Sequence, residues 1–456
     1  MPRFLKRCIV FPFKIFPREF YQGKQYQNYR ELAYRFEHSS ISEIQEYQFS
    51  IIKELIYHCY NTVPHYRRVW NNHGIDLRSI QSLEDFSSKI PFVSREQLLK
   101  NPEDFISDRY PSHSRLKVNT RGTSGMPLNL SYLKHYSRAA EWAHIHTLWS
   151  RIGYVPGSRI GRLKGDYIGK NQLSTFDPWR NTLILNPLKL NTETTDLYLN
   201  LLKKHKVEYI NAYPSALFNL IQLSKQKTFP ISSLKGILLS SENILSWQVK
   251  KFQKFFQIKN VYHWYGQGEQ CALGGGCEYS PFYHLLPTYS YTELIPQSKK
   301  PTKESGLLYE IVGTSFLNPL MPLIRYKTQD LCEPLSKKCS CGREHSLIKT
   351  VVGRKWEYAL GLNGEKISLI ALGFFRHFSY ADHITKMQMV NTQPGKLLIK
   401  IIPKKSFNKA HLAHVKNTFS VDQGLPFETR VELVEKIETT KAGKHRFFIR
   451  LFSLDE

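Results

Sequence analysis

The region between residues 158 and 263 alternates short apolar runs with amphipathic stretches, and this alternation limits the fold more than any other feature. The apolar runs predict strands at 158–163, 182–185, 207–211, 236–239 and 260–263. The stretches between them predict helices at 194–205, 215–225 and 246–256. Strands that alternate with helices at this spacing form parallel sheets with helical crossovers. The centre of the chain is therefore expected to be an α/β domain.

The regions on either side carry different patterns. Residues 24–72 and 133–152 show the apolar steps of helices, and Pro64 is expected to stop the first block. Shorter β-like runs follow residue 305, at 307–312 and 320–326, and the last ninety or so residues predict strands at 396–402, 430–435 and 447–451 around one helix. A chain of 456 residues is also too long for one core. The expected class is α/β: a large N-terminal domain (1–353) with parallel sheets, crossover helices and a β-rich subdomain, and a small α+β C-terminal domain (354–456).

Three polar segments follow predicted strands directly, at 213–215, 240–242 and 265–269. In open parallel sheets, ligands bind beyond the carboxyl ends of the strands, because successive strand ends meet at one edge. We therefore expect these three segments to build one shared site.

The segment 120–127, Thr-Arg-Gly-Thr-Ser-Gly-Met-Pro, places two hydroxyl side chains between two glycines. Glycine lacks a Cβ, so such a loop can bring backbone N–H groups close to an anion. No Gly-Lys-Ser/Thr follows, and this spacing excludes a Walker loop. The loop indicates a grip on the phosphates of a nucleotide; an ordinary polar turn is the simpler alternative.

The composition bears on partners and compartment. The net charge of +26 favours anionic partners, and because the basic residues are spread along the chain, a nucleotide ranks above nucleic acid. Seven cysteines, an odd number, indicate a reducing cytoplasm rather than a disulfide framework. No run reaches the ~20 apolar residues of a membrane span. Residues 1–21 mix basic and aromatic side chains, typical of a membrane-surface contact or of an arm packed on its own domain.

Further segments follow the glycine loop in a specific order: Ser240-Ser241-Glu242, Tyr265-Gly266-Gln267-Gly268-Glu269, Pro322 to Asp330, Gly353-Arg354 and Gly443-Lys444. Each is weak alone, but together they resemble the adenylate-forming superfamily. Within it the chain is most similar to the phenylacetate–coenzyme A ligase family, especially its members from capsule-polysaccharide biosynthesis. The resemblance covers most of the chain and implies a small C-terminal domain that is mobile.

The resemblance also implies roles for individual residues. Phosphate contacts fall to Gly122, Thr123, Ser124 and Gly125, and adenine contacts to Ser241, Glu242, Tyr265 and Gly266. It makes Glu269 the Mg²⁺ ligand, Asp330 the ribose ligand, Arg354 part of the interdomain motif and Lys444 the catalytic lysine. Several positions depart from the family pattern: Arg121 and Gly268 stand where hydroxyl residues are common, Gln329 replaces a glycine, and the acidic hinge residue often found just after Arg354 is replaced near Lys355-Trp356.

Cys277, His284, Cys339 and Cys341 offer four ligands suited to tetrahedral zinc. Several relatives carry a comparable set, so the resemblance supports a structural zinc with no open position for catalysis. Cys271 and Cys332 are alternatives for one ligand, and reduced, partly buried thiols beside a surface histidine are the competing explanation.

These features predict an ATP- and Mg²⁺-dependent ligase that activates a carboxylic acid as acyl-AMP, releases pyrophosphate and then transfers the acyl group to a thiol such as coenzyme A. Tyr213 and Trp264 are expected to line the acid pocket, with core packing as the competing explanation. An adenylyltransferase that places AMP on another acceptor, and a catalytically degenerate basic binding protein, are the alternatives. A homodimer is left open, and the capsule role rests on the resemblance alone.

Overall fold

The computed structural model describes residues 23–119, 128–164, 168, 172–242, 244, 246–297, 308–354, 358–364, 366–368, 383–418, 427–437 and 448–452. The chain divides into two compact units. Unit 1 comprises residues 1–121, 127–158 and 262–351, and unit 2 comprises residues 122–126, 159–261 and 352–456.

The helices of unit 1 are α2 (Gly23–Arg35), α3 (Ile41–Thr62), α4 (Pro64–Asn72), α5 (Leu83–Lys89), α6 (Arg95–Lys100) and α7 (Ser137–Ser150), with the 3-10 turns η3 (Leu77–Ser79), η4 (Pro102–Phe105) and η5 (Ser112–Ser114). Ser40 and Glu43 form a capping box that starts α3. Pro64 ends α3 and at once opens α4 at its first position, where the missing N–H costs nothing. The predicted end of a helix at Pro64 is confirmed, but the start of a second helix at the same residue was not predicted.

The strands of unit 1 are β1 (Arg115–Asn119), β2 (Asn129–Leu133), β8 (Val261–Gly266), β9 (Leu273–Gly275), β10 (Tyr283–Leu285), β11 (Ser290–Pro296), β12 (Tyr309–Ser315), β13 (Tyr326–Leu335) and β14 (Leu347–Arg354). β1 and β2 form an antiparallel pair, and the others lie side by side in the order β11-β12-β13-β14-β10-β9-β8. The predicted run at 320–326 is wrong, because β13 begins only at Tyr326.

The core of unit 1 joins the N-terminal helices to the turn before β13. It is built around buried Ile56, Tyr66 and Phe105 from the helical region and Ile324 from the turn. Tyr66 fixes this turn directly, because its hydroxyl donates to the Pro322 carbonyl at 2.9 Å. The segment that leads into β13 is therefore held by helices some 250 residues earlier in the chain.

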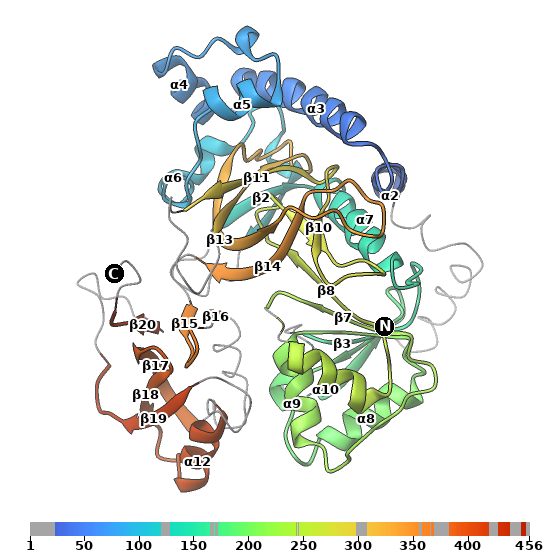
Figure 1. The fold of residues 1–456 in the computed structure, drawn as a ribbon, viewed down its shortest axis with the longest axis vertical. Coiled ribbons are helices and arrows are strands. Elements are labelled where there is room, and N and C mark those ends of the chain that lie inside the picture. The colour runs from blue at the N-terminus through green and yellow to red at the C-terminus, as the bar shows by residue number, and fades with distance from the viewer. Residues whose placement is uncertain are drawn as a thin grey trace. The chain divides into compact units, whose positions relative to one another are not determined.

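Unit 2 contains the strands β3 (Ile160–Leu163), β4 (Ser174–Asp177), β5 (Thr182–Leu185), β6 (Tyr209–Ala212) and β7 (Gly236–Ser240), with the 3-10 turn η6 (Pro187–Lys189) and the helices α8 (Thr195–Lys204), α9 (Pro214–Leu223) and α10 (Ser246–Phe256). β3 pairs in parallel with β5 and β6, and β6 with β7, as the alternation predicted. β4 pairs antiparallel with β5. The helices pack beside these strands over a shared apolar core (Figure 1).

The C-terminal part of unit 2 forms a four-stranded sheet in the order β19-β18-β17-β20. Its elements are β15 (Tyr358–Leu360), β16 (Lys366–Ser368), β17 (Ile384–Gln393), β18 (Lys396–Pro403), α12 (Lys409–Thr418), β19 (Glu428–Leu433) and β20 (Phe448–Arg450). Met389, Ile399, Val415 and Phe427 form a core of their own in this part. The predicted strands and helix are present, and the strands β15, β16 and β17 were missed.

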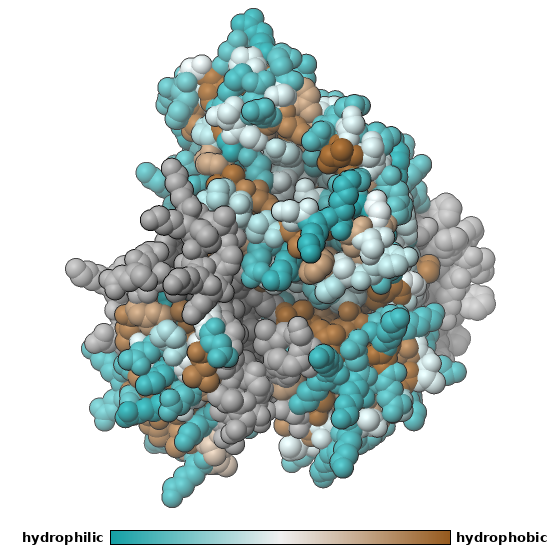
Figure 2. All heavy atoms as spheres, viewed as in Figure 1, coloured by the Kyte–Doolittle hydropathy of each residue, from teal (hydrophilic) through white to brown (hydrophobic). Residues whose placement is uncertain are grey.

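On the face drawn in Figure 2, hydrophilic residues predominate among the coloured residues, with hydrophobic ones in small groups. None of the described helices is long and apolar enough to cross a bilayer.

Candidate functional site

The centre of the candidate site in unit 1 is Glu269, three residues after the end of β8. Glu269 is only 6% exposed. Its carboxylate oxygen Oε1 lies 3.7 Å from Nη1 of Arg95, which is the first residue of α6. A carboxylate buried to this degree needs nearby positive charge. Sequence analysis identified Glu269 but not Arg95, whose only signal is its place directly after the N-cap serine of α6.

Tyr265 and Asp330, 65 residues apart, lie against each other. The Tyr265 hydroxyl donates to Asp330 Oδ2 at 2.7 Å. Burial, together with the neighbouring aspartate, holds the pKa of Tyr265 well above its ordinary value, so the phenol stays neutral and acts as the donor. The Asp330 N–H donates to the Thr328 hydroxyl at 3.1 Å, which orients the aspartate from its own strand. The structure thus brings Tyr265, one of the predicted adenine residues, together with Asp330, the predicted ribose residue.

The turn that carries Glu269 is anchored on both sides. The Tyr132 hydroxyl on β2 donates to the Gly268 carbonyl, and the Gln270 side chain donates to the Ser137 carbonyl at 3.3 Å. Gly313 on β12 passes so close that a Cβ there would lie 1.9 Å from the Cys271 carbonyl oxygen. Only glycine fits at residue 313, and this close approach fixes the backbone just after the carboxylate.

The backbone at Gln329 shows how a glutamine is accommodated where the family has a glycine. Its φ of 63° is in the left-handed region that favours glycine. Two contacts hold the glutamine there: its N–H donates to Glu310 Oε1 at 3.2 Å, and its Nε2 donates to Glu96 Oε1 at 3.4 Å. The backbone that presents Asp330 therefore keeps the glycine-like conformation without the glycine.

The candidate residues of unit 2 gather at the ends of its parallel strands. Lys164 directly follows β3, and its Nζ donates to the Ser240 hydroxyl at the end of β7 at 2.6 Å. The same ammonium lies 5.3 Å from the centre of the Tyr213 ring, which follows β6. Ser241 has a φ of 71° and, with Glu242, continues from β7. Sequence analysis missed Lys164, although its place after a predicted strand was the available signal.

Several predicted residues lie wholly or partly outside the described part of the chain. The phosphate loop with Gly122, Thr123, Ser124 and Gly125, and the lysine Lys444, lie outside the described residues. Arg354 ends β14, and its side chain is also outside them. Trp264 lies on β8, and its ring is 3.1 Å from the position of a Cβ on Gly266. The indole therefore packs against the backbone of the glycine in the adenine motif.

The four predicted zinc ligands come together in unit 1. The ligand atoms of Cys277, His284, Cys339 and Cys341 all lie within 4.8 Å of one another. The sulfurs of Cys277 and Cys339 are 3.5 Å apart, and Cys341 Sγ is 3.7 Å from His284 Nε2. Burial lowers the pKa of His284 to about 3, so its ring is neutral, the form that binds metals.

The cysteine ligands differ in their surroundings. Burial opposes ionisation of Cys339, but hydrogen bonds from Ser280 and Cys341 bring its pKa down to about 7. Backbone N–H groups of Tyr279 and Ser280 donate to Cys277 Sγ at 3.4 and 3.3 Å. The suggested substitutes Cys271 and Cys332 lie instead in two apolar cores.

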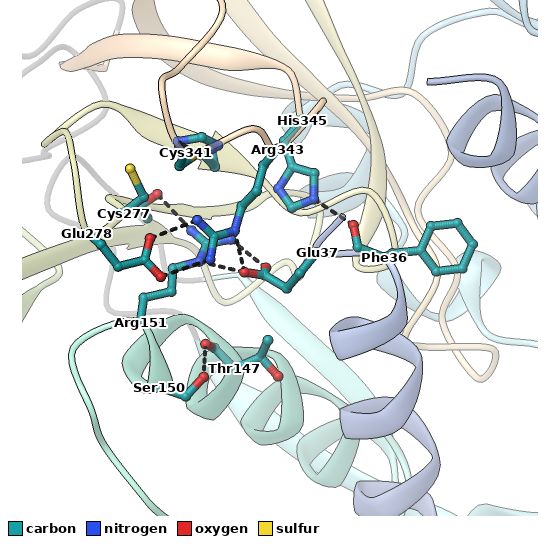
Figure 3. Close-up of polar contacts among 12 residues, drawn as sticks. Phe36, Glu37, Thr147, Ser150, Arg151, Cys277, Glu278, Cys341, Arg343 and His345 are labelled. Carbon is teal, nitrogen blue, oxygen red and sulfur yellow. Dashed lines mark hydrogen bonds and ion pairs between the residues drawn. The ribbon is translucent and has the colours of Figure 1, made fainter. Parts of the chain in front are cut away.

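A buried ion network lies beside this cluster (Figure 3). The Glu37 carboxylate accepts from Arg151 at 2.6 and 3.0 Å and from Arg343 at 2.6 Å. Arg343 also donates to both oxygens of Glu278, at 2.8 and 2.9 Å. Burial by itself would raise the pKa of Glu37. The guanidinium groups, above all that of Arg151, outweigh this effect and lower the pKa to about 2. Because Glu278 follows Cys277 directly, the network ties the end of the N-terminal helix α2 to the cysteine loops.

Comparisons with known proteins agree with this architecture. The structure matches that of 2-hydroxyisobutyryl-CoA ligase, solved in a postadenylation state, with a TM-score of 0.62, 18% identity and 91% of each chain covered. This similarity defines the class: the fold is that of the adenylate-forming ligases.

Sequence relatives narrow the class. The phenylacetate–coenzyme A ligase of Thermus thermophilus is 25% identical over 310 residues, which are 66% of this chain and 68% of that protein. The CapK protein of Staphylococcus aureus is 19% identical over 96% of this chain and 94% of its own, and residues 361–451 match the CapK C-terminal domain. The chain thus has the fold of the adenylate-forming ligases and is similar in sequence to the phenylacetate–coenzyme A ligases and to CapK.

Proposed function

We propose that this adenylate-forming ligase activates a small carboxylic acid with ATP, releases pyrophosphate, and transfers the acyl group to a thiol such as coenzyme A. The observation that carries the proposal is the contact between Tyr265 and Asp330 near buried Glu269, at the end of β8. The similarity to phenylacetate–coenzyme A ligases and CapK supports the ligase class. The choice of acid and acceptor is part of the proposal.

The described residues suit their proposed roles. Asp330 can accept hydrogen bonds from both ribose hydroxyls, and the flat ring of Tyr265 can pack against adenine. Glu269 presents a carboxylate oxygen, the ligand type that Mg²⁺ prefers, in a buried position beside a cation. The bound Mg²⁺ would offset charge on the phosphates. Tyr213 and Trp264 remain the candidates for the acid pocket.

The residues outside the described regions complete the proposal. The loop with Gly122 to Gly125 would hold the β- and γ-phosphates, and Lys444 would neutralise charge at the reacting carboxylate. Arg354 would belong to the hinge between residues 1–353 and 354–456. The separate core of the C-terminal part supports that boundary, because a part with its own core can move as a unit.

We also propose that the cysteine cluster binds a structural zinc ion. A tetrahedral site with Zn–S of about 2.3 Å and Zn–N of about 2.0 Å puts two sulfurs about 3.8 Å apart and a sulfur and a nitrogen about 3.5 Å apart. The sulfur–sulfur distance of 3.5 Å and the sulfur–nitrogen distance of 3.7 Å are close to these values. Three thiols and one neutral imidazole fill all four positions, so the ion would hold the loops of the cluster in place.

The capsule role and the compartment are proposals as well. The match to CapK along 96% of the chain supports a function in surface-polysaccharide biosynthesis. The free thiols of the described cysteines support a reducing cytoplasm. Contact of residues 1–21 with a membrane surface, and a homodimer, are further proposals that rest on the sequence and the family alone.

A pyrophosphate-release screen over aromatic, amino, hydroxy and sugar acids, with and without coenzyme A, tests the function. Acid-dependent pyrophosphate exchange is expected. Exchange without any acid would favour the adenylyltransferase alternative, because only the ligase needs an acid to start. No ATP binding, together with steeply salt-dependent binding to DNA or RNA, would favour the degenerate basic binding protein.

A further inference from the structure

One edge of the parallel sheet in unit 2 is formed by the segments that precede its strands. β3, β5, β6 and β7 run in parallel, so all four begin at this edge. The Ile160 N–H donates to the Asn181 carbonyl at 3.1 Å, which places the turn before β5 beside the start of β3. The Glu208 N–H donates to the Arg159 carbonyl at 2.8 Å, and the Lys235 N–H donates to the Glu208 carbonyl at 2.7 Å. These segments therefore form a continuous row, the strand-start edge.

The strand-start edge lies opposite the candidate site residues of unit 2. Lys164 and Tyr213 directly follow β3 and β6, and Ser240 ends β7. Strands of four or five residues, at about 3.3 Å per residue, separate the two edges by about 15 Å. A partner that binds at the strand-start edge therefore need not touch the residues at the other edge.

Basic residues dominate the strand-start edge, which comprises residues 158–159, 177–181, 203–208, 235 and 259–260. Its acidic residues are Asp177 and Glu208, whereas its basic residues are Arg159, Arg180, Lys203, Lys204, Lys206, Lys235 and Lys259. Glu208 pairs with Lys235 at 2.7 Å, and the Lys235 side chain is still 59% exposed. Asp177 lies 3.9 Å from Arg180, whose side chain is 75% exposed. The carboxylates therefore offset only part of an exposed positive charge.

The helix dipole accounts for only some of this charge. Lys203 and Lys204 lie in the last turn of α8, where cations offset the negative end of the dipole. Lys235 and Lys259 lie outside the helices, in segments between a helix and a strand. Burial and then the neighbouring cations lower the pKa of His205 below its ordinary value. Positive charge therefore gathers along this edge and not only at one helix end.

Exposed aromatic side chains lie at the same edge. Trp179, in the turn between β4 and β5, is 56% exposed, and Phe176 on β4 is exposed as well. The Phe176 ring stacks on His205 with the ring centres 5.5 Å apart, so the turn is held against the end of α8. The backbone N–H groups of Trp179 and Arg180 donate to Asp177 Oδ1 at 2.9 and 3.2 Å and shape the turn. A tryptophan presented among lysines suits the headgroup layer of a bilayer, where indole rings settle and anionic lipids attract lysines.

We propose that the strand-start edge docks this part of unit 2 on an anionic membrane surface, with Trp179 in the headgroup layer and the lysines beside the lipid phosphates. The proposal goes beyond the proposed function and does not depend on it. Lysine-rich composition favours a membrane over nucleic acid, because lysines act as point charges, whereas the planar groups of arginines pair with phosphates and bases in fixed geometry. Docking here leaves the carboxyl ends of β3, β6 and β7 directed away from the lipid.

Co-sedimentation of the full chain with lipid vesicles tests the proposal. The wild type should bind phosphatidylcholine vesicles that contain phosphatidylserine, bind pure phosphatidylcholine vesicles far more weakly, and lose affinity as salt is added. Replacement of Lys204, Lys206 and Lys259 together by glutamine should weaken binding by roughly a hundredfold, since each lysine near the surface contributes roughly fivefold. No binding of the wild type to the anionic vesicles would overturn the proposal.

The matched control replaces Lys53, Lys100 and Lys405 by glutamine, three exposed lysines outside the strand-start edge. This control has the same net charge as the first variant and should bind the vesicles like the wild type. Both variants should keep the wild-type melting temperature, because every replaced side chain except Lys206 lies on the surface without a role in a core, and Lys206 is exposed as well. Equal loss of binding in both variants would overturn the proposal, because net charge and not this edge would then control binding.

Fluorescence quenching by brominated phosphatidylcholine in the same vesicles tests the place of Trp179. Emission of the wild type should fall on binding, and Trp179→Phe should lose most of this quenching while it still binds. Quenching that is unchanged in Trp179→Phe would overturn the proposed orientation. A DNA oligonucleotide is the competing probe: if the wild type binds DNA but not the anionic vesicles, and the lysine variant loses that binding, the edge is a nucleic-acid surface and the membrane proposal is wrong.

Discussion

Glu37→Gln is the perturbation whose size follows most directly from the structure. Glu37 is 5% exposed and accepts three hydrogen bonds of 2.6–3.0 Å from Arg151 and Arg343. A pKa of about 2, against the ordinary 4.5, corresponds to about 3 kcal/mol of preferential stabilisation of the ionised carboxylate in the folded state. A neutral amide leaves the buried Arg151 guanidinium without the Glu37 anion and Arg343 with only Glu278, and breaking such a buried pair typically costs about 3–5 kcal/mol. We expect Glu37→Gln to lower the free energy of unfolding by about 3 kcal/mol at pH 7.

The pH dependence gives an independent check. Because the pKa of Glu37 is lower in the folded state, its contribution is complete above pH 4.5 and is lost as the pH falls toward 2. The difference between wild type and Glu37→Gln should therefore be constant from pH 7 to 5 and shrink below that. Urea denaturation followed by tryptophan fluorescence measures both quantities.

Glu54→Gln on α3 is the matched control, because Glu54 is exposed and the same chemical change there should alter stability by less than about 0.5 kcal/mol. The reasoning is refuted if Glu37→Gln is as stable as this control at pH 7. A difference that persists undiminished at pH 3 would also refute the assignment to the carboxylate charge.

Four further outcomes are expected. Metal analysis should find about one zinc ion per chain in the wild-type protein, and Cys341→Ser should remove it; unchanged metal content would contradict the proposed ligand set. Gln329→Gly should change the free energy of unfolding by less than about 1 kcal/mol in urea denaturation, because relief of the left-handed φ offsets the greater freedom of the unfolded chain; a large loss would show that the Gln329 side chain matters more than its backbone. Lys444→Ala should abolish acyl-adenylate formation, followed by pyrophosphate release, and leave ATP binding largely intact; wild-type turnover would exclude the proposed role. Glu269→Gln should raise the Mg²⁺ concentration needed for half-maximal pyrophosphate release by roughly tenfold or more, and an unchanged requirement would remove Glu269 as the metal ligand.

Local patterns along the chain were sufficient for the α/β class. The strand predicted at 182–185 and the helix predicted at 246–256 coincide with β5 and α10, because the periodicity of apolar residues reports which face of an element is buried. The short strands of unit 1 were harder to predict. β9 and β10 span three residues each, too few to show a period.

The resemblance to the ligase family likewise predicts the nucleotide residues, and the ligand types of three cysteines and one histidine predict the zinc site. Tyr265, Glu269 and Asp330 are proposed from the sequence because they match the family motifs in the family order. The same reasoning marks Gln329 as a departure, but it does not show that the position needs a left-handed backbone.

Other features were decided only by tertiary structure. Arg95 lies 174 residues before Glu269, and Glu37 lies 306 residues before Arg343. No local pattern marks an arginine or a glutamate as the partner of a charge so far along the chain, because such a pair forms only when separate elements pack together and exclude water from between them. The sequence by itself determined which chemical groups the protein carries and in what order; packing decided which charges became buried together, and that burial is what gives these pairs their strength.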